Sequence, residues 1–123
     1  MSGGGAASPL PFFSAYAASK AGIVRFVENI SKELMLHKID INAVAPGPIN
    51  TRMLDEVLRE SPDTVGRAFY NKSLIQKKSG GTKIKKILEC IEFLCHKKSD
   101  VISGKLISVL WDNWKNFYKY KKI

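Results

Sequence analysis

The spacing of apolar residues predicts a long amphipathic helix over residues 14–37. Apolar side chains recur there at intervals of three and four residues, which places them on one face of a helix. The stripe consists of Ile23, Val27, Ile30 and Leu34, and Phe26 widens it. Ser14 stands just before this pattern and is a favourable N-cap residue. We therefore expect a helix that begins after Ser14 and buries its stripe against a neighbouring layer.

Two short β-branched segments predict strands over residues 39–44 and 105–110. The first strand runs into Pro46-Gly47-Pro48, and loops of this kind bind ligands at the carboxyl ends of parallel strands. A helix between two strands implies that they pair in parallel through a right-handed crossover. Two parallel strands do not form a stable sheet by themselves. The fold class is therefore α/β, with two strands and about four helices. The two strands are the end of a larger sheet, so the fold is incomplete.

The segment between the strands predicts three helices. Two short ones are expected over residues 52–60 and 63–76, because Ser61-Pro62 interrupts the pattern. An insertion after a strand end often covers a site as a mobile flap. A third helix over residues 83–96, capped by Thr82, has an apolar face. This face consists of Ile84, Ile87, Leu88, Ile91 and Leu94.

Composition indicates one small domain: the chain has 123 residues, of which 45% are hydrophobic. No apolar run reaches the roughly 18 residues of a membrane span, and the first residues lack the features of a signal peptide. We expect a cytoplasmic protein. Cys90 and Cys95 lie on different faces of one predicted helix, so we expect two reduced thiols, no disulfide and no metal site.

The net charge of +9 comes largely from lysines after residue 72. Such a balance attracts nucleic acid or an acidic partner, but a solvated surface explains it equally simply. No helix-turn-helix, zinc-finger or RNA-binding signature accompanies the charge, so we do not expect nucleic-acid binding as the main function.

Tyr16 and Lys20 are the candidate catalytic pair. Four residues apart on a helix, they lie on the same face, one turn from each other. An ammonium beside a phenol favours the phenolate and makes the tyrosine a usable proton donor and acceptor. A serine hydroxyl such as that of Ser2, if brought close, could bind a substrate carbonyl. The pair alone is a weak signal, because this spacing is common on ordinary helices.

Three segments together resemble the short-chain dehydrogenase/reductase family. The first contains Ser2 and the run Ser14-Ala15-Tyr16-Ala17-Ala18-Ser19-Lys20, which is similar to the family's catalytic segment. Residues 41–51 resemble its cofactor loop after the sixth strand, and residues 102–108 resemble its last strand. The order and spacing of all three make the resemblance specific, and it covers residues 2–114.

The resemblance implies a Rossmann-type doubly wound sheet and an NAD(P)-dependent oxidoreductase that acts on a small carbonyl or alcohol. It implies that Tyr16 is the general acid/base, that Lys20 holds the nicotinamide ribose, and that Ser2 orients the substrate. It assigns the nicotinamide side to Pro46, Gly47, Ile49 and Thr51, with Tyr16 and Lys20. The family also forms homo-oligomers through the helix that carries Tyr16. The implied segments are a catalytic helix (14–37), a strand and cofactor loop (39–51), a substrate flap (52–77), a helix and last strand (83–110) and a basic aromatic tail (111–123).

The sequence departs from the family pattern in one respect: these 123 residues contain no glycine-rich turn after a strand, which in the family binds the dinucleotide. Gly3-Gly4-Gly5 is not such a turn, because no strand precedes it. We therefore expect the C-terminal half of a dehydrogenase, with an incomplete NAD or NADP site, inactive without a separately supplied N-terminal half. A second hypothesis is a truncated, non-catalytic product or docking module. A third is a basic nucleic-acid binder that uses the lysine-rich C-terminal part.

Overall fold

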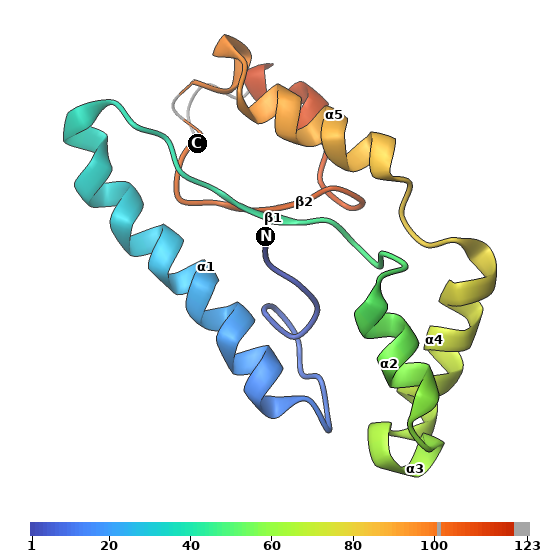
Figure 1. Ribbon diagram of the computed structural model, residues 1–123. Helices are drawn as coiled ribbons and strands as arrows, with labels where there is room; N and C mark the ends of the chain where they lie inside the picture. Colours follow the sequence, from blue (N-terminus) through green and yellow to red (C-terminus); the bar gives the residue numbers. More distant parts are fainter. Residues whose placement is uncertain (101, 120–123) are drawn as a thin grey trace.

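The computed structural model describes residues 1–100 and 102–119, which form a partial α/β fold around two short parallel strands (Figure 1). The α-helices and strands in chain order are α1 (Ser14–Leu34), β1 (Ala43–Ala45), α2 (Arg52–Arg59), α3 (Pro62–Val65), α4 (Arg67–Ser79), α5 (Ile84–Leu94) and β2 (Leu106–Ser108). Three 3-10 helices complete the elements: η1 (Met35–His37), η2 (Lys97–Ser99) and η3 (Trp114–Lys119). Within these described ranges, no helix is both long and apolar enough to cross a membrane. Residues 101 and 120–123, which include the end of the predicted aromatic tail, lie outside the described residues.

The two predicted strands and their parallel pairing are confirmed, but both strands are shorter than predicted. β1 and β2 pair in parallel with Val44 opposite Ile107. Before β1, the side chain of Asn42 adds to the backbone bond from Gly104 N to Ile41 O (2.7 Å): its Nδ2 donates to Ile102 O (2.6 Å) and its Oδ1 accepts from Lys105 N (3.1 Å). After β2 the chain turns, because Ser108 N donates to Asp112 Oδ2 (2.7 Å) and Asp112 N donates to Ser108 O (3.2 Å).

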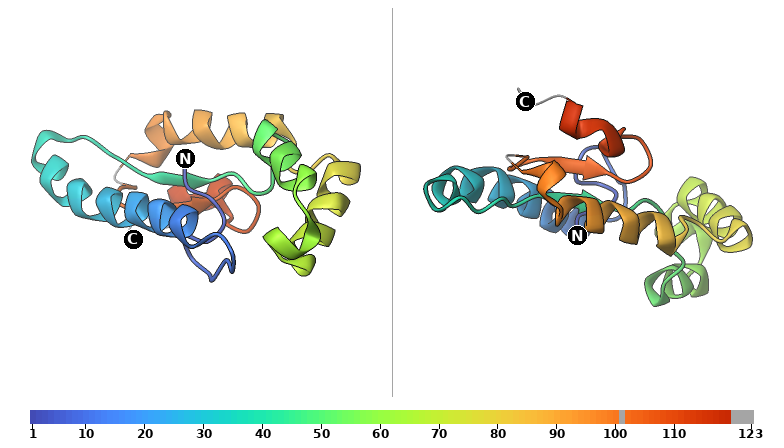
Figure 2. Two further views of the ribbon diagram at one scale, coloured as in Figure 1. Left: turned by 60° about the horizontal axis from the view of Figure 1, so that its bottom comes forward. Right: turned by 90° about the horizontal axis from the view of Figure 1, so that it is seen from above.

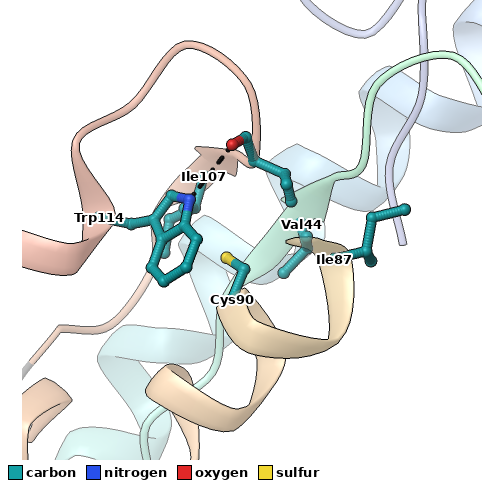
Figure 3. Close-up of a cluster of buried hydrophobic side chains, with 6 residues drawn as sticks. Val44, Ile87, Cys90, Ile107 and Trp114 are labelled. Atoms are coloured by element: carbon teal, nitrogen blue, oxygen red, sulfur yellow. Dashed lines mark hydrogen bonds between the residues drawn. The ribbon is translucent and has the colours of Figure 1, made fainter. Parts of the chain in front are cut away.

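The main core lies between the sheet and α5 (Figure 3). Val44, Ile87, Cys90, Ile107 and Trp114 are buried against one another, together with Val109. The indole Nε1 of Trp114 donates to the carbonyl of Val109 (3.2 Å), so this large side chain is buried with its one polar group paired. Figures 1 and 2 show α1 on the opposite side of the strands from α5. The strands are therefore covered on both faces, as a parallel pair requires.

The first residues of the chain form a third segment beside the sheet. The Ser2 N–H donates to Val44 O (2.8 Å), on the edge of β1 away from β2. In both Figures 1 and 2, residues 1–13 pass between α1 and the group α2–α4. This hydrogen bond ties down a terminal segment that would otherwise be poorly held.

Three predicted helix boundaries are wrong. α1 begins at Ser14 itself, and its N-cap is Phe13, which makes no side-chain capping bond. The predicted helix over residues 63–76 is two helices, α3 and α4, separated at Gly66, whose φ of +85° breaks the helical path. Thr82 does not cap α5; its hydroxyl is buried, and the N-cap is Lys83. The flap therefore contains three helices, which raises the α-helix count in the described residues from the expected four to five.

The apolar faces of the two long helices are only partly buried. Val27 of α1 is buried, whereas Phe26, expected to widen the buried stripe, is 60% exposed. Of the predicted α5 face, Ile87 is buried and Leu94 packs against the core, beside the buried Cys90. The other three residues of that face are largely exposed, namely Ile84, Leu88 and Ile91. Both helices thus carry a second apolar surface that the described residues do not cover.

The two cysteines differ in a way that thiol labelling measures. Cys95 is exposed and Cys90 is buried, and burial raises the Cys90 pKa from 9.0 to about 11. We expect a thiol reagent at pH 8 to modify Cys95 rapidly and Cys90 only on unfolding. Unfolding lowers the Cys90 pKa, so the unfolded chain loses the thiol proton at a lower pH than the folded chain does. The contribution of the buried thiol to folding stability is therefore complete below pH 9 and is lost as pH rises toward 11. Equal labelling rates of both thiols in the native protein would contradict the expectation.

Candidate active site

Gly3 lies against two of the three candidate catalytic residues, Tyr16 and Lys20. A Cβ placed on Gly3 would lie 2.6 Å from the Tyr16 hydroxyl oxygen and 3.8 Å from the Lys20 Cε. Ser2 is the covalent neighbour of Gly3 and is held by its hydrogen bond to β1. The structure therefore brings Tyr16 and Lys20 against the backbone at Gly3, next to Ser2 in the chain.

Tyr16 and Lys20 owe their positions to the first two turns of α1. Their spacing puts both side chains on one face, and the Lys20 ammonium lies over the Tyr16 ring, 5.4 Å from its centroid. Both side chains are half-buried. A Cβ placed on Gly5 would lie 2.8 Å from the Ala17 Cβ. The N-terminal segment therefore comes this close to the helix because both residues are small. The result is a phenol with a cation beside it, facing the Ser2-Gly3 backbone.

The Ser2 hydroxyl is buried without a hydrogen-bond partner. Ser2 is only 4% exposed, and its Oγ has no partner among the residues that the structure describes. Buried hydroxyls are nearly always paired, because an unpaired one costs about 1–3 kcal/mol. The Ser2 side chain is thus a buried donor and acceptor without a partner, one residue before Gly3.

The Pro46-Gly47 turn leaves the carboxyl end of β1 and can be formed only with glycine at its second position. Gly47 has φ +83°, and a Cβ there would lie 2.5 Å from Thr82 Oγ1 and 2.6 Å from Leu110 Cδ1. Pro46 is buried, and Gly47 is exposed. This turn therefore presents bare backbone to solvent at the edge of the sheet where open α/β folds bind ligands.

Ile49 and Thr51 lie at the far end of the same loop. Ile49 is half-buried against the core and forms an antiparallel bridge with Gly81. Thr51 is the N-cap residue of α2, yet its side chain makes no capping bond and is exposed. Its hydroxyl is therefore available to a ligand. Tyr16 and Lys20 contact Gly3, whereas the bridge of Ile49 with Gly81 joins this loop to the connection between α4 and α5.

Sequence patterns did not identify three residues that shape this site. The sequence predicts either a close approach to a ligand or a flexible start for Gly3-Gly4-Gly5, a helix cap for Thr82, and the end of a flap helix for Gln76. Gln76 donates its Nε2 to Ile49 O at 3.1 Å. Each acts through contacts between segments that are distant in sequence. The triple glycine was the one local signal, since it allows a close approach of backbone to a ligand or side chain.

Gly3→Ala is expected to displace the Tyr16 side chain. The new methyl group would overlap the hydroxyl, because a separation of 2.6 Å is well inside van der Waals contact. NMR of the Tyr16 ring protons should show a large chemical-shift change. Gly4→Ala is the matched control, since nothing lies within 4 Å of a Cβ at Gly4 and its φ is not in the positive range. Similar Tyr16 spectra for both variants would show that Gly3 does not contact the phenol.

Comparison with known proteins assigns the chain to a family. A family model described as enoyl-(acyl carrier protein) reductase matches residues 1–109. A short-chain dehydrogenase/reductase of Armillaria gallica is 35% identical over 101 residues, which cover 80% of this chain and 38% of that protein. The 3-oxoacyl-(acyl-carrier-protein) reductase FabG of Thermotoga maritima is 33% identical over 94 residues, or 76% of this chain and 35% of the relative.

A third relative is a plant protein. The NADPH-dependent aldehyde reductase-like protein of Arabidopsis thaliana chloroplasts is 32% identical over 109 residues, which cover 80% of this chain and 34% of the relative. The matched part thus spans little more than a third of the length of these curated relatives. The segments that carry the resemblance, Ser2 to Lys20 and residues 41–51, lie within the matched range. This chain belongs to the short-chain dehydrogenase/reductase family.

Proposed function

We propose that this chain provides the proton-transfer site and the nicotinamide-facing loop of an NAD(P)-dependent oxidoreductase that interconverts small-molecule carbonyls and alcohols. The observation that carries the proposal is the position of Tyr16 and Lys20 against Gly3, the residue that follows Ser2. The unpaired, buried Ser2 hydroxyl supports it, since a substrate oxygen would provide the missing partner. In the family to which the chain belongs, residues of these types at this spacing act on a carbonyl oxygen.

Each of the three side chains has a role in this chemistry. The Ser2 hydroxyl donates a hydrogen bond to the substrate carbonyl and orients it. The Tyr16 hydroxyl gives its proton to the same oxygen during reduction and takes it back during oxidation. The Lys20 ammonium stabilises the phenolate that is left, because an opposite charge close by favours the ionised form. General acid/base catalysis of this kind contributes about 10²- to 10⁴-fold.

The nicotinamide, when bound, supplies or accepts the hydride. We assign it to Pro46, Gly47, Ile49 and Thr51, together with the ribose-binding Lys20 and with Tyr16. The bare backbone at Gly47 and the uncommitted Thr51 hydroxyl fit a flat ring with a carboxamide substituent. NAD and NADP are both candidate cofactors. They differ only at the adenosine end, whereas the residues named here are assigned to the nicotinamide end.

The segment 52–77 is proposed as the flap that covers the substrate. A cavity of about 500 Å³ lies between residues 10–12 and the helices α3 and α4, and its lining is mainly apolar. Its apolar side chains are those of Leu10, Pro11, Phe12, Val65 and Phe69. Phe13 packs its ring against Phe69 at 4.7 Å, one turn before Tyr16. The cavity thus adjoins the start of the catalytic helix and suits the non-reacting apolar part of a substrate.

Self-association through α1 is the second proposed property. Ile23 and Phe26 lie exposed on the helix that carries Tyr16 and Lys20. Large apolar side chains exposed together on one helix are typical of an interaction surface. This feature would also support the alternative of a non-catalytic docking module, which would bind through α1 without turnover.

The proposal is tested by carbonyl-dependent oxidation of NADH and NADPH, followed at 340 nm, with the chain alone and with a polypeptide that carries the preceding strands and glycine-rich turn of the fold. Turnover that appears only in the mixture supports the proposal and a separate N-terminal half as partner. A soluble complex without turnover would favour the docking module and contradict the catalytic proposal.

A further inference from the structure

The loop that we assign to the nicotinamide is bound along one side by residues 76–82. The Thr82 N–H donates to Pro48 O (2.6 Å), and Ile49 pairs with Gly81 as an antiparallel bridge. Gly81 has φ +65°, and a Cβ there would lie 2.6 Å from Pro48 O, so only glycine allows this approach. The end of α4 and the turn after it therefore form a fixed support for the loop.

Gln76 adds the side-chain part of this support. Its Nε2 donates to the carbonyl of Ile49 (3.1 Å) and lies 3.4 Å from Asn50 Oδ1. The Asn50 amide in turn donates to Lys77 O (3.3 Å), so the two side chains form a closed set of bonds between the loop and the last turn of α4. A single side-chain amide thus holds one backbone oxygen and one side-chain oxygen of neighbouring loop residues.

The helix that carries Gln76 also reaches the proposed substrate cavity. Phe69 and Gln76 are seven positions apart on α4, which places them on the same face of the helix. At the Phe69 end the helix contacts Phe13, one turn before Tyr16. Near the Gln76 end, Lys77 Nζ is paired with Asp55 of α2 at 2.6 Å. One rigid helix therefore joins the flap, the start of the catalytic helix and the cofactor loop.

We propose that Gln76 is a positioning residue for the nicotinamide. By holding Ile49 O and Asn50 Oδ1, it sets the path of the backbone from Ile49 to Thr51, and thereby the groups that face the carboxamide. This inference rests on the proposed function, because it takes residues 46–51 as the nicotinamide side. Gln76 itself needs no contact with the cofactor.

The test uses the complete 123-residue chain, labelled with ¹⁵N, and three variants. Gln76→Met removes the donor while keeping length and helix propensity. Gln76→Lys restores a donor at the same position. Lys78→Met is the matched control, because it introduces the same side chain on the same helical turn at an exposed position. Backbone order parameters of residues 49–51 are measured, and reduced nicotinamide mononucleotide is titrated as the probe.

In Gln76→Met we expect the order parameters of residues 49–51 to fall from about 0.85 to below about 0.6. The dissociation constant for the probe should rise about two- to tenfold, because binding must then order a loop that Gln76 no longer holds. Gln76→Lys should recover both values in part, and Lys78→Met should change neither. Circular dichroism should show that Gln76→Met and Lys78→Met are both folded at the temperature of the titration, which separates positioning from a general loss of structure.

The inference and the proposed function fail in different ways. An ordered loop in Gln76→Met, or a mobile loop with unchanged affinity for the probe, would overturn the positioning role of Gln76 alone. A wild-type chain that binds the probe neither alone nor in the mixture with the dinucleotide-binding polypeptide would overturn the cofactor role of residues 46–51 and with it the positioning role. Binding to wild type, combined with the expected changes in Gln76→Met and recovery in Gln76→Lys, supports both.

Discussion

Tyr16→Phe is expected to lower carbonyl reduction by about 10²- to 10⁴-fold, in the mixture of this chain with a dinucleotide-binding polypeptide. The substitution removes one oxygen atom and leaves the ring that faces Gly3 and the Lys20 ammonium. Packing of α1 should therefore be unchanged, and the loss is confined to the proton that the hydroxyl donates to the substrate oxygen. Stopped-flow measurement of hydride transfer at saturating cofactor and carbonyl gives the fold-change directly.

Tyr118→Phe is the control for this experiment, because Tyr118 is an exposed residue of η3 far from Gly3 in the chain. It should retain full activity. A Tyr16→Phe variant with more than about a third of wild-type turnover would show that another group transfers the proton. A loss accompanied by unfolding would be recognised by circular dichroism and would not count as support.

Trp114→Ala is expected to destabilise the fold by about 3–5 kcal/mol, the cost of replacing a buried tryptophan by alanine. Trp114 is 3% exposed, packs 5.9 Å from the Phe93 ring and donates its indole N–H to Val109 O. Its removal leaves a cavity between α5 and β2 and an unpaired buried carbonyl. Because domains are stable by only about 5–15 kcal/mol, the variant should lie close to unfolding at room temperature.

Trp111→Ala is the matched control, since Trp111 is three residues away and 88% exposed. Substitutions at such positions change stability by about 0.5 kcal/mol or less. Urea unfolding should be followed by circular dichroism, because each variant removes one of the two tryptophans. Equal midpoints for the two variants would show that Trp114 does not stabilise the core, and that the packing in Figure 3 is not maintained in solution.

The break between α3 and α4, and the contact of the flap with residues 10–12, could not be predicted from the sequence. Local composition indicated a helix over residues 63–76, and only the positive φ of Gly66 explains why two helices form instead. Glycine within a helical pattern is tolerated often enough that sequence does not identify such a break. The Phe12 ring also lies against Gly66, and both residues line the cavity. A periodic pattern within one helix cannot indicate a contact between segments so far apart in the chain.

The exposed apolar residues of α1 and α5 illustrate a second limit. Periodicity identifies which residues share a broad face, and it grouped Ile87 and Leu94 with Ile84, Leu88 and Ile91. It does not identify which side of that face meets the sheet. The sheet contacts Ile87 and Cys90, because the crossover from β1 to β2 brings that side of α5 over Val44 and Ile107.

The sequence by itself determined the α/β class, the parallel strand pair, the family and the one-turn spacing of Tyr16 and Lys20, because each depends on local pattern or on order along the chain. Only the tertiary structure decided that Ser2 is held at the edge of β1, that Gly3 lies against the phenol, and that Gln76 supports the loop at Ile49. These contacts join residues from different segments. Their geometry follows from packing and hydrogen bonding between elements, which the order of residues along the chain does not contain.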